Sequence, residues 1–280
     1  MNPEPYDPIE PENERQLAWQ PFCTVTLMLP DTVIKWGHKI RPLEEASMRL
    51  VEKHAPSIPI PQLKHAIYKY DASDGEAFYG ELFMSYVPGK TLKAAWAGFD
   101  DATKGRICQD IWDMVATIRT IPRPAHLAGD NNQNAHLYCT ADGSPSRNPL
   151  LGDNNDVTPA FLDEQTFRDR IYARYVAHNG LSYRDSAEYL PDRLPRSDTD
   201  TGPVFTHGDI APRNIIVDDD GRILALLDWE SSGWFPDWWE YAQMMGICDE
   251  LEYDWQHWME RTRPVPWDIS AIQKARRVLF

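Results

Sequence analysis

The chain has 280 residues and a formal net charge of -15 at pH 7, and this charge argues against a nucleic-acid partner and against an anionic membrane, both of which need a basic surface. It permits a cationic small-molecule substrate, because an acidic cleft attracts cations, although an acidic surface also serves solubility alone. No apolar run is long enough to cross a bilayer, and the first residues lack the features of a secretory leader. The four cysteines are far apart and form no CxxC pair, so we expect reduced thiols in a cytoplasmic protein.

The first part of the chain is predicted to be rich in strands. Residues 1–16 are dense in proline and glutamate, and we expect a poorly ordered arm. Residues 42–54 predict a helix, because apolar side chains recur at three- and four-residue spacing and a proline suits its first turn. Four runs that are apolar, aromatic or β-branched predict strands, the first two as a hairpin around a Pro-Asp turn. These strands are expected at 22–29, 32–36, 65–70 and 77–86.

The rest of the chain is predicted to be mainly helical. Helices are expected at 91–98, 101–120 and 162–177, and again after residue 238. Pro-, Gly- and Asp-rich stretches at 121–160 and 191–203 indicate loops. Two short apolar runs, 214–217 and 223–227, flank a DDDG turn and predict a second hairpin.

Residues with catalytic potential lie in and directly after this region. Residues 206–214 read THGDIAPRN, and they repeat the five-residue step from Asp to Asn of the protein-kinase catalytic loop, H-R-D-x-x-x-x-N, with Asp209 and Asn214. Asp228 follows the strand 223–227, where a carboxylate at a rigid strand end suits a hard cation that bridges phosphates. Because apolar strands frame both acids, we predict a phosphoryl-transfer site here.

These segments resemble a known family. Residues 206–218, THGDIAPRNIIVD, are similar to the HGD-x-x-P-x-N-I-L-x-D signature of aminoglycoside phosphotransferases and choline kinases. The motif LDWE at 227–230 resembles their IDWE and adds Glu230 as a supporting residue. Fungal phosphotransferase-family proteins are especially similar, with further matches at VIKWG, IPIP, YVPGKTL and RNPL. The resemblance extends over roughly residues 24–245.

The resemblance implies an α+β, two-lobed, protein-kinase-like fold. A small β-rich N-terminal lobe would occupy residues 17–87, and a larger, mainly helical C-terminal lobe would occupy residues 88–280. The implied activity is the ATP- and Mg²⁺-dependent transfer of a phosphoryl group to a hydroxyl or amine of a small metabolite, as in a biosynthetic pathway. The acceptor itself and the choice of ATP over GTP stay open.

The resemblance also implies roles in the C-terminal lobe. Asp209 would be the catalytic base or would orient the acceptor hydroxyl, and Asn214 and Asp228 would hold Mg²⁺. His207 would brace the catalytic loop. Arg213 would either stabilise the transferring charge or form an ion pair with a surface acid.

In the N-terminal lobe the resemblance implies a nucleotide site. Lys35 would contact the ATP phosphates and pair with a glutamate of the following helix. Glu45 is the preferred partner, and its neighbour Glu44 stays a rival because periodicity does not separate them. Backbone groups near Ser85 and Val87 would bind adenine.

One feature departs from the family. Kinases cover the phosphates with a glycine-rich loop, but no glycine precedes Gly37 in this chain. With one clear strand before Lys35, the first strand and its loop are expected to be shortened or missing. Two alternatives therefore stay open: a degenerate kinase fold that acts as a binding module, and a kinase-fold enzyme that uses Asp209 or Asp228 for acid/base chemistry without ATP.

Tryptophans gather in the C-terminal part of the chain. A cation–π cage for a quaternary ammonium group is one interpretation, and a helical core is the interpretation that we favour. The residues concerned are Trp229, Trp234, Trp238, Trp239, Trp255 and Trp258.

Overall fold

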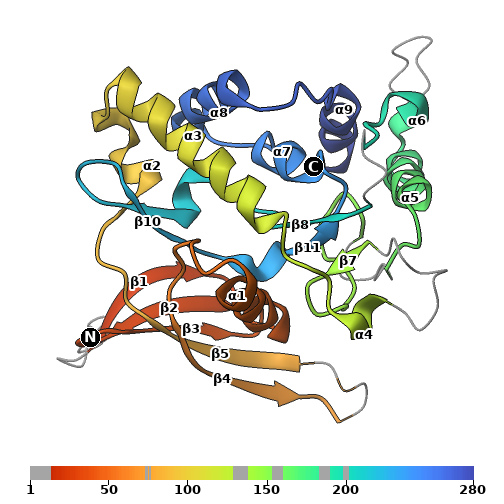
Figure 1. Ribbon diagram of the computed structural model, residues 1–280. Helices are drawn as coiled ribbons and strands as arrows, with labels where there is room; N and C mark the ends of the chain where they lie inside the picture. Colours follow the sequence, from red (N-terminus) through yellow and green to blue (C-terminus); the bar gives the residue numbers. More distant parts are fainter. Residues whose placement is uncertain are drawn as a thin grey trace, which may run out of the picture.

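The computed structural model describes residues 14–72, 75, 77–128, 138–152, 160–182, 190–197 and 202–280. The expected arm therefore lies outside the described residues except for its last three positions. A five-stranded sheet with one helix against it forms one part of the molecule, and a larger group of helices forms the other (Figure 1). The α+β, two-lobed prediction is confirmed.

The N-terminal sheet is entirely antiparallel, in the order β1-β2-β3-β5-β4. Its strands are β1 (Glu14–Gln20), β2 (Cys23–Met28), β3 (Thr32–Gly37), β4 (Leu63–Tyr70) and β5 (Ala77–Ser85). The expectation that the first strand is shortened or missing is wrong, because β1 has seven residues and pairs with β2 from Glu14 to Gln20, with one irregularity between Gln16 and Ala18. Alternation of apolar and polar residues did not reveal β1, because this edge strand is exposed along its length. The proposed division of the chain after residue 87 lies just behind the end of β5.

Helix α1 (Pro42–His54) covers this sheet. Proline occupies its first turn, acidic residues follow there, and basic residues lie in its last turn, so each end complements the helix dipole. Its buried stripe includes Leu43, Met48 and Val51, which belong to the core. The same helix packs against residues 229–231, and this contact brings the two lobes together at the site described below.

The C-terminal lobe is built from helices joined by short strands. Its longer helices are α3 (Asp101–Ile118), α5 (Glu164–Ala177), α8 (Glu250–Thr262) and α9 (Ser270–Leu279). Its shorter helices are α2 (Leu92–Ala95), η1 (Trp96–Gly98), α4 (Ala125–Ala128), η3 (Gly180–Ser182), α6 (Leu190–Arg193), η4 (Pro212–Asn214), η5 (Trp229–Ser231) and α7 (Trp239–Met244).

Two three-stranded sheets hold the segments that are predicted to be catalytic. One has the order β10-β9-β6 and the other β7-β11-β8, and all pairs are antiparallel. Their strands are β6 (Lys90–Thr91), β7 (Cys139–Thr140), β8 (Val204–Thr206), β9 (Ile215–Val217), β10 (Ile223–Leu226) and β11 (Gly233–Phe235). The predicted hairpin is β9–β10, and residues 207–214 connect β8 to β9. The catalytic segment is thus held by a different sheet at each end.

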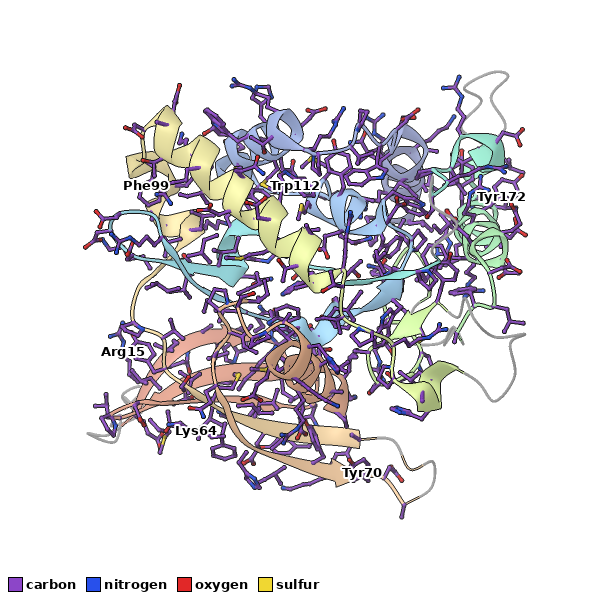
Figure 2. All side chains as sticks on the ribbon, viewed as in Figure 1. Arg15, Lys64, Tyr70, Phe99, Trp112 and Tyr172 are labelled. Atoms are coloured by element: carbon purple, nitrogen blue, oxygen red, sulfur yellow. The ribbon has the colours of Figure 1, made fainter. Side chains whose placement is uncertain are left out.

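The tryptophans lie mainly in the core, as we favoured. Trp229, Trp234, Trp238, Trp239 and Trp255 are almost completely buried, while Trp258 is partly buried against the same cluster. Trp112 lies inside the helical lobe, where its indole N–H donates to the Met259 carbonyl at 3.3 Å (Figure 2). Because their faces are covered by other side chains, the five buried rings do not form an open cage.

Two expectations from composition can be compared with the structure. The four cysteines are free thiols. Among the described residues, no helix is both long and apolar enough to cross a bilayer.

Candidate active site

The catalytic loop begins with a backbone turn that only glycine accommodates. Gly208 has φ = 82°, and a Cβ there would lie 2.5 Å from the carbonyl oxygen of Ser231. The buried imidazole of His207 spans the loop: its Nε2 donates to the Leu227 carbonyl (2.9 Å), and its Nδ1 accepts from the N–H of Asp209 (3.1 Å). These two bonds place the proton on Nε2 and connect the segment that carries Asp209 to the strand end before Asp228.

His207 is expected to produce a dependence of stability on pH. Burial lowers its pKa to about 4 from 6.5. Between these values the unfolded chain binds a proton that the folded chain does not, so stability falls as the pH drops from 6.5 towards 4. The total is about 3 kcal/mol. Other groups, Glu240 among them, titrate in the same range, so the test is a difference: urea unfolding at pH 7.5 and pH 4.5 should show about this much more loss of stability in the wild type than in His207→Gln, and equal changes in both would contradict the assignment.

Glu240 also holds this loop in place, and it was not predicted from the sequence. Its buried carboxylate accepts from the backbone N–H groups of His207 (2.6 Å) and Gly208 (3.1 Å). Burial raises its pKa to about 7. The sequence held one signal for this role: Glu240 is an acidic residue on the predominantly apolar segment after residue 233. A carboxylate buried there needs hydrogen-bond donors, and the backbone of a neighbouring loop can provide them.

Asp209 lies at the centre of a small hydrogen-bond network. Its Oδ1 accepts from Arg213 Nη2 (2.6 Å), and its Oδ2 accepts from Asn214 Nδ2 (2.8 Å). Burial raises the pKa of the Asp209 carboxyl, and these two donors offset part of that effect. A carboxylate held by two donors and partly exposed can orient a hydroxyl and accept its proton.

Lys35 joins the lobes through carboxylates. Its Nζ lies 2.7 Å from Glu44 Oε2, 2.7 Å from Asp228 Oδ1 and 3.4 Å from Glu230 Oε2. Burial alone would lower the pKa of Lys35, which is 8% exposed, but the three carboxylates outweigh burial and raise it well above the ordinary value. Lys35 is therefore a permanently charged group between three acids.

The preferred choice of Glu45 as the partner of Lys35 is wrong. Glu44 is buried and faces Lys35, whereas Glu45 turns to Arg49 on its own helix at 2.6 Å. Adjacent helical positions differ by about 100° in direction, so only one of the two can point at the sheet. The packing of α1 against residues 229–231 decides which one.

The acidic cluster fits a divalent cation. Carboxylate oxygens of Glu44, Asp228 and Glu230 lie within 4.8 Å of one another. Asp228 has φ = 67°, a left-handed conformation that is costly for a residue with a side chain and is typical of functional sites. Asn214 lies beside it, because the Leu227 N–H donates to the Asn214 carbonyl at 2.8 Å. The Nδ2 of Asn214 is bound to Asp209, so its Oδ1 is the end left for a hard cation.

A cavity of ≈ 540 Å³ lies between the lobes, and this cluster forms part of its wall. Its walls carry apolar side chains of the sheet, the predicted metal ligands, and residues 85–87, which are predicted to bind adenine and are called the hinge below. The N–H groups of Ser85 and Tyr86 donate to Gln62 O and Asp31 O, at 2.9 and 2.8 Å, whereas the N–H of Val87 has no acceptor among the described residues and is available to a ligand. Four cations also line the cavity: Arg15, Lys35, Lys39 and Arg213.

The turn between β1 and β2 is short and packs against the end of β3 and the residues that follow it. It consists of residues 21–22, and the Phe22 carbonyl accepts from the Lys39 N–H at 3.2 Å. A Cβ on Gly37 would lie 2.2 Å from that carbonyl, so the glycine is needed for the close approach. The prediction of a missing glycine-rich loop thus survives in a changed form: both strands are present, and a two-residue turn without glycine connects them.

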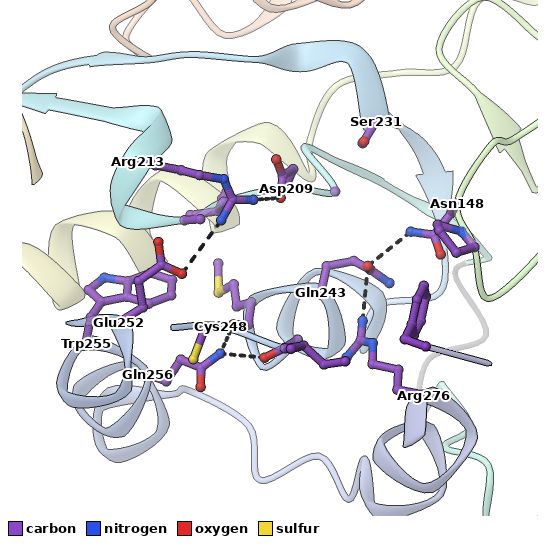
Figure 3. A pocket seen from close by; sticks show the side chains of 18 residues that line it. Asn148, Asp209, Arg213, Ser231, Gln243, Cys248, Glu252, Trp255, Gln256 and Arg276 are labelled. Atoms are coloured by element: carbon purple, nitrogen blue, oxygen red, sulfur yellow. Dashed lines mark hydrogen bonds and ion pairs between the residues drawn. The ribbon is translucent and has the colours of Figure 1, made fainter. Parts of the chain in front are cut away.

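A second cavity of ≈ 550 Å³ lies on the other side of the catalytic loop, within the C-terminal lobe. Asp209 lines this cavity, and Asn148 and Pro149 of the RNPL match do so too. Figure 3 shows Arg213 between Asp209 and Glu252 at its upper edge. Arg213 lines both cavities, which therefore meet at this side chain.

The comparisons with known proteins agree with this geometry. The model of the phosphotransferase enzyme family matches residues 25–263. The chain belongs to this family. Comparison with the curated proteins gave no match.

Solved structures with the same fold include several aminoglycoside phosphotransferases. A variant of APH(4)-Ia in complex with ADP and hygromycin B is 13% identical, with a TM-score of 0.58 over 95% of this chain and 84% of that one. APH(2")-IIa in complex with streptomycin and ATP is 11% identical, with a TM-score of 0.55 over 96% and 81%. The GDP complex of aminoglycoside 2'-phosphotransferase-IIIa is 16% identical, with a TM-score of 0.52 over 97% and 82%. At these identities the likeness concerns the fold.

Proposed function

We propose that this member of the phosphotransferase enzyme family transfers the γ-phosphoryl group of ATP, with Mg²⁺, to a hydroxyl or amine of a small metabolite. The structural neighbours support a nucleotide and a small molecule as ligands, because they are complexes of aminoglycoside kinases with ATP, ADP or GDP. The proposal extends to the roles of the site residues, and a biosynthetic pathway is the setting that it favours.

One observation carries this proposal: the predicted base and the predicted metal ligands face different cavities. Asn214 and Asp228 line the cavity between the lobes, together with Lys35 and the hinge. Asp209 lines the cavity of the C-terminal lobe. A donor nucleotide and an acceptor could therefore bind at the same time from opposite sides, which is what direct transfer requires.

The residues suggest how transfer occurs. Asp209 holds the acceptor O–H and takes its proton while a bond forms from that oxygen to the γ-phosphorus and the bond to the β,γ-bridging oxygen breaks. Mg²⁺ held by Asn214 Oδ1, Asp228 and Glu230 would neutralise phosphate charge. Lys35 binds the phosphates, and Arg213 lies where the transferring group passes between the cavities. The cations that line the cavity, including Lys39 and Arg15, take over the charge compensation that a glycine-rich loop gives in other kinases.

Calorimetry with ATP and millimolar Mg²⁺ tests the nucleotide part of the proposal, and a coupled ADP-release assay with a pool of alcohols and amines tests transfer. We expect binding in the micromolar to millimolar range and turnover that requires both Mg²⁺ and an acceptor. The tight β1–β2 turn motivates the alternative of a binding module, which absent ATP binding would favour. Product formation in nucleotide-free, EDTA-treated reactions would instead favour acid/base chemistry without ATP.

A further inference from the structure

The cavity within the C-terminal lobe, which Asp209 lines and which is called the acceptor-side cavity from here on, is also lined by an arginine without an acidic partner. Arg276, on α9, is 6% exposed, and its guanidinium donates to the carbonyl of Ala242 and, at 3.1 Å, to Gln243 Oε1. Among the described residues, no carboxylate forms an ion pair with it. Burial lowers its pKa to about 10, and no acidic side chain counters that effect. Buried charges in proteins are ordinarily paired, so this cation calls for a partner.

Gln243 presents a second donor in the same place. Its Oε1 accepts from Asn148 Nδ2 (3.1 Å) and from Arg276, and these two donors fix the orientation of the amide. Its Nε2 is consequently turned the other way, and it is buried with no hydrogen-bond partner. Figure 3 shows Gln243 between Asn148 and Arg276 on the wall of the cavity. Arg276 and Gln243 therefore bring two buried donor groups to one cavity wall, and neither has an acidic partner among the described residues.

The acids of the cavity already have cationic partners. Asp209 is bound by Arg213 at 2.6 Å. Glu252, which is 4% exposed, lies 3.3 Å from Lys93 and 3.7 Å from Arg213. Arg213 is shared between Asp209 and Glu252, and Arg276 is the charged side chain of the cavity wall that forms no ion pair with a described residue. Both acids of the cavity thus have a cation within ion-pair distance, whereas Arg276 would repel a cationic acceptor.

We infer that the acceptor carries a carboxylate, which binds Arg276 and Gln243 Nε2 while its hydroxyl or amine lies at Asp209. A carboxylate suits this place better than a phosphate, because its single charge equals that of the arginine and its planar oxygens match a guanidinium fork. The cavity of ≈ 550 Å³ has room for such a molecule. The inference rests on the proposed function only in treating this cavity as the acceptor site.

The bond from Arg276 to Ala242 also serves the fold, since it satisfies a carbonyl near the end of α7. That role requires a donor but not a ligand. Arg276→Lys retains the charge on a single donor nitrogen in place of the guanidinium fork, whereas Arg276→Gln removes the charge. Arg277, the next residue, is exposed and does not line the cavity, so Arg277→Gln is a matched control for the loss of one positive charge on α9.

The test is binding without nucleotide, so that it stays informative if phosphoryl transfer fails. The probes are matched compounds: 4-hydroxybenzoate, 4-hydroxybenzamide, 4-hydroxybenzylamine and 4-hydroxyphenyl phosphate, and 3-hydroxybutyrate with its amide. Dissociation constants come from ligand-observed NMR with the full chain at millimolar probe concentrations. We expect each carboxylate to bind the wild type about 10- to 100-fold more tightly than its amide, which corresponds to one charge-assisted hydrogen bond.

The variants assign that preference to Arg276. Arg276→Gln should lose the preference for the carboxylate while its affinity for the amide changes little, and Arg277→Gln should retain it. Thermal unfolding shows whether each variant folds. If Arg276→Gln does not fold, Arg276→Lys replaces it, and this variant should show a reduced preference for the carboxylate over the amide. The inference is overturned if no carboxylate binds the wild type, if the amide, amine or phosphate binds as tightly, or if the preference persists without Arg276.

Discussion

Asp209→Asn should lower kcat by about 10²- to 10⁴-fold, the range that a positioned general base contributes. Asparagine preserves the size of the side chain, and it can still accept from Arg213, which lies 2.6 Å from the carboxylate. It cannot take the proton of the acceptor, and it has one strong acceptor fewer to share between Arg213 and Asn214. Because Asp209 lines the acceptor-side cavity, the loss should appear in kcat with little change in the dissociation constant of ATP.

A matched control separates this effect from a general loss of charge. Asp219 lies on the β9–β10 turn, and its exposed side chain pairs with Lys90. Asp219→Asn should leave kcat within a factor of about two, because exposed ion pairs contribute little. Steady-state and single-turnover kinetics of both variants provide the measurement. Turnover by Asp209→Asn at the wild-type rate would reject Asp209 as the base.

Lys35→Met should reduce both activity and stability. Glu44 is 2% exposed, and loss of its cationic partner leaves a buried, uncompensated carboxylate, which costs about 3–5 kcal/mol. Asp228 loses the partner that lies 2.7 Å away, so the proposed metal and phosphate site changes its charge as well. We expect an ATP dissociation constant at least tenfold higher by calorimetry and an early urea transition.

The double variant Lys35→Met/Glu44→Gln distinguishes the two effects. It removes the unpaired carboxylate, so most of the lost unfolding free energy should return while nucleotide binding stays weak. Glu45→Gln is the control on the neighbouring position, where the exposed partner is Arg49, and it should change stability by less than about 0.5 kcal/mol. If Glu45→Gln, added to Lys35→Met, restored as much unfolding free energy as Glu44→Gln does, this result would contradict the pairing seen in the structure. Lys64→Met, on the outer strand β4, controls for the loss of a lysine from the same sheet (Figure 2).

The sequence by itself was sufficient for the catalytic loop and its hairpin. Spacing determines them, because Asp209 and Asn214 lie on one short turn whose geometry depends on neighbours in the chain, and β9 and β10 are joined by a five-residue polar turn. Helix α1 could be predicted to the residue, because a proline, an apolar stripe and a charged last turn all mark its bounds. The strand β1 could not, since its exposed residues show no apolar alternation.

The tertiary structure decided the features that depend on residues far apart in the chain. It selected Glu44 over Glu45 as the partner of Lys35, because the direction of a helical side chain matters only once the helix is packed. It brought Glu240 under the catalytic loop and Arg276 to the cavity wall, where burial gives each charge a consequence that composition does not show. The acidic chain as a whole permitted a cationic substrate, whereas the pairing of individual charges in one cavity favours a carboxylate. Net charge is a sum over the surface, and recognition depends on the few charges that stay unpaired inside a site.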